Sequence, residues 1–244
     1  MYMNRFFILL YGILILITSC NEAPEFPNTP KIEFNNIIFK DISGGEADSL
    51  ILYIDFQDGD GDLGLGTEEI APPYNEKNYF SNKTGDLFDF DNETVDDLMV
   101  LSNRSTIDTL PSYFGDAKCL NWDENPDLFL TNGSQLNDTV YFQFNERHYN
   151  FLIDWFVDKG SGFESFDWRL DIDCSTDYNG RFPYLKDTNK SKSLEGTIKY
   201  GMTSFGFKSI FQDYTLKLRI KILDRSGNYS NAIETPPFKL SDID

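Results

Sequence analysis

The chain has 244 residues, with 40 acidic residues against 21 basic ones and a formal net charge of −19 at pH 7. This acidic excess argues against nucleic acid and anionic lipid headgroups as partners, because both are densely negative. Aromatic residues make up 16% of the chain, which is enough for a packed core and excludes general disorder.

Residues 1–19 read as a secretory signal, with a positive charge at Arg5 followed by an apolar run over residues 6–17. That run is too short for a membrane-spanning helix, which needs ~20 apolar residues. The stretch Ile17-Thr18-Ser19-Cys20 resembles the lipobox of bacterial lipoproteins, which implies a lipid on Cys20. A cleaved signal without lipid, or an uncleaved anchor, is the alternative. Residues 20–30 are rich in proline, so we expect an extended tether.

Alternation of apolar and polar residues predicts strands, because successive side chains of a strand face opposite sides. The clearest case runs from Thr215 to Asp224, and the same pattern occurs over residues 49–57, 151–157, 140–144 and 32–34. No stretch has a convincing helical period, and turns rich in Gly and Asn separate the apolar runs. The sequence therefore predicts an all-β fold, an antiparallel β-sandwich of the immunoglobulin-like type.

The length of residues 31–244 fits a single domain. Residues 65–137 differ from the rest, since they hold Pro72-Pro73, many Asn and Asp residues and scattered aromatics. We interpret this stretch as an insertion of long loops and hairpins into the sandwich.

The run Asp58-Gly59-Asp60-Gly61-Asp62-Leu63-Gly64 follows the strand predicted at residues 49–57. Its three carboxylates repel one another unless a cation lies between them, and the glycines allow the backbone angles of a loop that wraps an ion. Asp58, Asp60, Asp62, Gly64 and Glu69 match ligand positions 1, 3, 5, 7 and 12 of an EF-hand loop. Leu63 stands where that loop needs glycine, and no helices flank it, so a site at a strand end is the better interpretation.

In an immunoglobulin-like sandwich, the loop after residues 49–57 and the loop after residues 215–223 lie at the same end. Asp224 and Asn228 could then approach the acidic loop. We therefore expect one structural calcium ion, with Asp58, Asp60, Asp62, Gly64, Glu69 and Asp224 as candidate ligands. An unoccupied acidic turn is the alternative.

With Cys20 lipidated, Cys119 and Cys174 could form one disulfide in an oxidising envelope, or remain as two free thiols. Trp122, between polar neighbours in the insertion, is a candidate contact for a glycan, and core packing is the alternative for it. The chain has one histidine, His148, and no motif of a hydrolytic triad, a zinc protease or a phosphate-binding loop. We therefore do not expect an enzyme.

Four features together resemble a group of envelope lipoproteins of Bacteroidota: the signal with its lipobox, the run Phe56 to Gly64, the turn Asn179 to Pro183, and the segment Ile222 to Asn231. The last feature is also similar to the final hairpin of bacterial immunoglobulin-like and fibronectin-like domains. The resemblance implies an envelope location and a sandwich fold, and it brings no catalytic residues.

These observations predict an outer-membrane lipoprotein that faces the periplasm or the outside. We expect it to act as a calcium-stabilised binding or scaffolding module with a protein or glycan partner. The alternatives are an accessory subunit of an outer-membrane assembly or uptake complex, and an enzyme acting on polysaccharide.

Overall fold

The structure is a computed structural model, and it describes residues 25–42, 46–106, 110–111, 113, 116–124, 126–185 and 193–243. The expected signal peptide, the expected lipidation site Cys20 and the start of the expected tether lie outside these residues. Within them, none of the helices combines the length and the apolar character that a membrane crossing requires.

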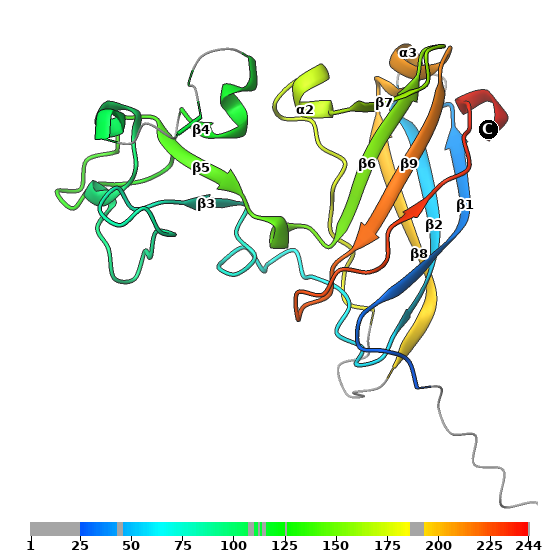
Figure 1. Cartoon of the computed structure of the whole chain (residues 1–244), viewed down its shortest axis with the longest axis horizontal. Helices are drawn as coiled ribbons and strands as arrows, with labels where there is room; N and C mark the ends of the chain where they lie inside the picture. The colour runs from blue at the N-terminus through cyan, green and yellow to red at the C-terminus, as the bar shows by residue number, and fades with distance from the viewer. Residues whose placement is uncertain are drawn as a thin grey trace, which may run out of the picture.

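Two antiparallel sheets face each other and form a β-sandwich (Figure 1). One sheet has the order β1-β2-β8, and its strands are β1 (Lys31–Lys40), β2 (Asp48–Asp58) and β8 (Leu194–Ser204). The other has the order β10-β9-β6-β7, with β6 (Phe151–Asp158), β7 (Phe163–Phe166), β9 (Thr215–Ile222) and β10 (Ile233–Glu234). The predicted all-β antiparallel sandwich is confirmed, and its immunoglobulin-like refinement stays a prediction.

The core lies between the two sheets and is built by alternation. In β9 every second residue is fully buried, namely Leu216, Leu218, Ile220 and Ile222. Burial of one such side chain stabilises the fold by about 1.5–3 kcal/mol. The two short helices α2 (Trp168–Asp171) and α3 (Phe207–Phe211) add aromatic rings to the core, where the Trp155 ring stacks near Phe207 and Phe211.

Strand β8 is the longest element that the alternation pattern misses. Gly196 and Gly201 interrupt it, and glycine weakens a strand pattern because it offers no side chain to pack. Only Ile198 and Met202 of this strand are buried, although Tyr200 stacks on Phe151 with ring centres 4.1 Å apart. Tertiary packing therefore decides its conformation.

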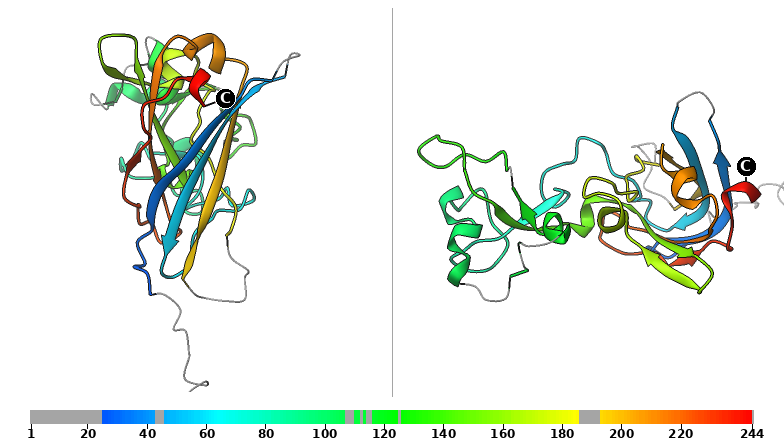
Figure 2. Two further views of the ribbon diagram at one scale, coloured as in Figure 1. Left: turned by 90° about the vertical axis from the view of Figure 1, so that its right-hand side faces the viewer. Right: turned by 90° about the horizontal axis from the view of Figure 1, so that it is seen from above.

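The chain between β2 and β6 forms a separate unit, which we call the side lobe and define as residues 77–144 (Figures 1 and 2). Its sheet has the order β3-β5-β4, with β3 (Lys77–Tyr79), β4 (Trp122–Asp123) and β5 (Val140–Phe144). Short 3-10 helices complete the chain: η1 (Val95–Asp97), η2 (Leu101–Thr106) and η3 (Asp116–Leu120) in the lobe, η4 (Glu146–His148) after it, and η5 (Leu240–Asp242) near the C-terminus. The strand expected at residues 140–144 thus pairs inside the lobe instead of in the sandwich.

A disulfide joins the side lobe to the sandwich. Cys119 lies in η3, and Cys174 follows α2; their Cα atoms are 6.0 Å apart and the bridge closes a separation of 55 residues. Such a link stabilises a fold mainly by restricting the unfolded chain.

We expect the double variant Cys119→Ser, Cys174→Ser to lose at most about 4 kcal/mol of unfolding free energy, as chain entropy predicts for a loop of this size. Denaturant unfolding of a chain carrying Cys20→Ser measures the loss. Equal stability of variant and parent, together with two free thiols in the non-reduced unfolded parent, would contradict the bridge.

Candidate metal centre

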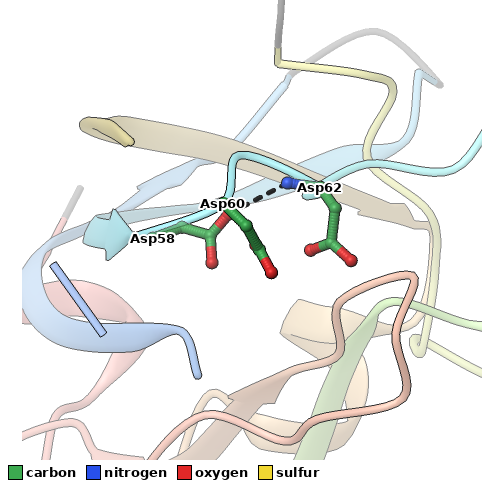
Figure 3. Close-up of side chains that lie close together, drawn as sticks. All are labelled: Asp58, Asp60 and Asp62. Atoms are coloured by element: carbon green, nitrogen blue, oxygen red, sulfur yellow. Dashed lines mark hydrogen bonds between the residues drawn. The ribbon is translucent and has the colours of Figure 1, made fainter. Parts of the chain in front are cut away.

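The acidic loop begins at the last residue of β2, Asp58, whose side chain is fully buried. The loop turns back at once, because the backbone N–H of Asp62 donates to Oδ2 of Asp58 at 3.1 Å (Figure 3). Gly61 makes this turn possible with φ of 69°, a left-handed angle that glycine adopts without strain.

Three carboxylates converge in this loop. One carboxylate oxygen each from Asp58, Asp60 and Asp62 lies within 4.8 Å of the others, and the side chains point to the same side of the loop (Figure 3). Two oxygens that bind one calcium ion at about 2.3–2.6 Å can be no more than about 5 Å apart, so this spacing fits a shared cation. Among the described residues, no other group of three acids, histidines or cysteines meets the same criterion.

Each of the three aspartates has an oxygen, Oδ1, that is buried and accepts no hydrogen bond from the described residues. Buried polar atoms are almost always partnered, so three convergent exceptions require an explanation. A hard cation supplies one, because it binds carboxylate oxygens and offsets their repulsion.

The pKa values of the loop aspartates reflect the same repulsion. Burial, with Asp60 and Asp62 nearby, raises the pKa of Asp58 to about 7. Burial also raises the pKa of Asp60, and the charges of Asp62 and Asp224 add to the effect. Without a cation, Asp58 is therefore protonated in about half of the molecules at pH 7.

Asp224 lies beside the cluster, on the turn that follows β9. The neighbouring residue Ser226 donates from its backbone N–H and its hydroxyl to Oδ2 of Asp62, at 3.0 and 2.7 Å. The two carboxylate oxygens of Asp224 itself accept from the backbone and side chain of Asn228, at 2.7 and 2.9 Å. Asp224 thus adds negative charge next to the cluster while its own hydrogen bonds hold the turn.

Glu69 does not join the cluster. Its two oxygens accept from the Arg225 guanidinium at 2.9 and 2.8 Å, and Tyr184 and the backbone of Gly66 also donate to it. These donors hold the pKa of Glu69 down at about 2. The EF-hand spacing suggested Glu69 as a bidentate ligand. In the structure Glu69 instead pairs with Arg225 and holds the turn after β9 in place.

Two glycines of the loop are needed for close contacts. A Cβ on Gly64, where φ is 111°, would lie 2.4 Å from Cα of Tyr184. A Cβ on Gly59 would lie 2.1 Å from the carbonyl oxygen of Phe26, and the Gly59 N–H donates to the Pro27 carbonyl at 2.9 Å. Phe26 and Pro27, at the end of the expected tether, therefore contact the acidic loop directly. The sequence pattern did not reveal this contact.

Trp122 lies in the side lobe and is only 2% exposed. It packs on Tyr141 and Tyr113, and its indole N–H donates to the Pro111 carbonyl at 3.2 Å. The expectation of an exposed glycan contact at Trp122 is wrong. Pairing of β4 with β5 places the indole ring inside a small hydrophobic core, where a glycan cannot reach it.

Comparison with protein-family models, curated proteins and solved structures returns no match to this chain.

For the metal-free protein, we expect stability to fall as the pH rises from about 4 to about 7. The folded pKa of Asp58, about 7, lies above the ordinary 3.8, so the folded state keeps a proton that the unfolded chain has lost. Between about pH 5 and 7 the loss is about 2–3 kcal/mol, at ~1.4 kcal/mol per pKa unit. Chemical unfolding in chelator measures it.

Asp58→Asn should remove most of this pH dependence. Asp55→Asn is the matched control on the same strand, because hydrogen bonds from Thr197 and Asn35 lower the pKa of Asp55 and give it the opposite sign. A metal-free protein that is equally stable at pH 5 and pH 7 would contradict the account of Asp58.

Proposed function

We propose that the chain is a lipid-anchored protein of the bacterial outer membrane whose β-sandwich is stiffened by one calcium ion and serves as a binding module. The observation that carries the calcium site is the convergence of three buried carboxylate oxygens without hydrogen-bond partners. The anchor rests on the signal and lipobox at residues 1–20. The strand order β1-β2-β8 opposite β10-β9-β6-β7 supports an immunoglobulin-like assignment of the sandwich.

Calcium suits this site better than other common metals. The donors are carboxylate oxygens, with neither histidine nor cysteine among them, which disfavours zinc. Magnesium demands near-ideal octahedral geometry and keeps several waters, whereas calcium accepts six to eight oxygens in irregular arrangements. Asp58, Asp60 and Asp62 would supply three of these oxygens, with backbone carbonyls and water for the rest.

The ion would act as a clamp rather than as a catalyst. Three segments meet at the acidic loop: the tether through Pro27, the chain leaving β2 for the side lobe, and the turn after β9 through Ser226. Neutralising the carboxylates would hold all three segments together at the end of the sandwich where the tether enters (Figure 1).

We expect millimolar calcium to raise the melting temperature of the mature chain. A site with a Kd of roughly 10⁻⁴ to 10⁻³ M, typical of extracellular modules, gives about 1–2 kcal/mol at 5 mM calcium, or roughly 2–8 °C. Asp60→Asn should abolish the response, and Asp55→Asn should preserve it. A melting temperature that does not change with calcium, or a response that persists in Asp60→Asn, would contradict the proposal.

The clamp also predicts calcium-dependent protection of the tether. A glutamate-specific protease can cut after Glu25, next to the Phe26-Pro27 segment that contacts the acidic loop. Calcium should slow this cut because it orders the loop to which that segment binds. Gly59→Ala should speed cleavage even with calcium, since the new Cβ has no room. Gly201→Ala, where a Cβ meets nothing within 4 Å, is the matched control. Equal cleavage rates in all three proteins would show that the tether is not seated there.

A further inference from the structure

The corner between the side lobe and the sandwich is hollowed. Two cavities of about 340 Å³ each lie there, and both are lined by Phe144, Asp154, Arg169, Asp177 and Asn179. Because they share these residues, we treat them as one feature, the corner groove. Each cavity alone falls within the roughly 300–1,000 Å³ of small-molecule sites, which form preferentially between structural units.

The walls of the corner groove are fixed to each other. Arg169 of α2 places its guanidinium 3.8 Å from the centre of the Phe144 ring, which belongs to the side lobe. The same guanidinium donates to Asp177 at 2.8 Å. The Cys119–Cys174 disulfide adds a covalent link between lobe and sandwich where η3 approaches α2. A preformed groove loses less conformational entropy when it binds a ligand.

Residues that line the corner groove carry unsatisfied donors. Nε of Arg169 and the indole N–H groups of Trp155 and Trp168 are buried and have no partner among the described residues. Because these three atoms are shielded from solvent, they lie behind the wall of the corner groove, and the choice of ligand falls to the charges and rings that line it.

The charge of the corner groove excludes an anion as that ligand. Its lining carboxylates are Glu76, Glu146, Asp154, Asp167 and Asp177, and its lining basic side chains are Arg169 and Lys221. Asp154 is exposed on β6 and accepts no hydrogen bond from the described part of the chain. Its carboxylate can therefore accept a hydrogen bond from a hydroxyl of the ligand. A purely cationic ligand would meet like charges at Arg169 and Lys221 of the same lining.

Partly exposed aromatic rings complete the lining. Phe144, Tyr149 and Tyr229 border the first cavity, and such rings offer flat apolar faces beside polar groups. Neutral sugars match this combination, because their hydroxyls both donate and accept and their C–H faces pack on aromatic rings. We infer that the corner groove binds a neutral oligosaccharide. This inference rests on the proposed role as a binding module and names its ligand class.

Calorimetric titration of the mature chain with neutral hexasaccharides of glucose, mannose and xylose tests the inference, with oligogalacturonate as the anionic comparison. We expect at least one neutral probe to bind with a Kd below about 1 mM, and to quench tryptophan fluorescence. Arg169→Met should weaken this binding about tenfold or more. Lys217→Met is the control for loss of a positive charge, because Lys217 pairs with Glu234 and lines neither cavity of the groove.

Asp154→Ala, an exposed change that spares the core, should weaken binding likewise and keeps the test valid if Arg169→Met fails to fold. Binding of none of the neutral probes, binding of oligogalacturonate alone, or equal effects of Asp154→Ala and Lys217→Met would overturn the inference. Running each titration with calcium and with chelator separates the two proposals. Sugar binding without any calcium response refutes only the metal centre, and the reverse result refutes only the groove.

Discussion

Repulsion among the buried carboxylates of Asp58, Asp60 and Asp62 is the constraint on which the end of the sandwich depends. Coulomb energy between charges a few Å apart grows steeply once water is excluded, so the folded loop must take up either a proton or a cation. Uptake of a proton is the first solution, and the pKa of Asp58, raised to about 7, reflects it. In our account calcium is the second, and it leaves the loop ionised and closed at neutral pH.

Around that centre, ordinary interactions arrange the segments that the loop must hold. The Glu69–Arg225 ion pair, with side chains 20% and 31% exposed, joins the chain leaving β2 to the turn after β9. Pro27 fastens the tether through the N–H of Gly59. The chain that leaves this loop builds the side lobe, and the lobe forms one wall of the corner groove.

Much of the fold could be predicted from local pattern, and the reasons for the misses are physical. Strands such as β9 alternate strictly, so their burial follows from the sequence. Strand β8 carries two glycines and gains its conformation from packing on β2. The three aspartates could be grouped because they lie on one short loop. The pairing of Glu69 with Arg225, the burial of Trp122 and the seat of Phe26-Pro27 depend on contacts between distant segments, which spacing does not encode.

Crystallography of the mature chain in millimolar calcium, with anomalous scattering recorded from a lanthanide soak, tests the central claim most directly. The account predicts one strong peak at about 2.3–2.6 Å from the unpartnered oxygens of Asp58, Asp60 and Asp62. A loop without a peak, in which these oxygens hydrogen-bond to one another through a protonated Asp58, would contradict it.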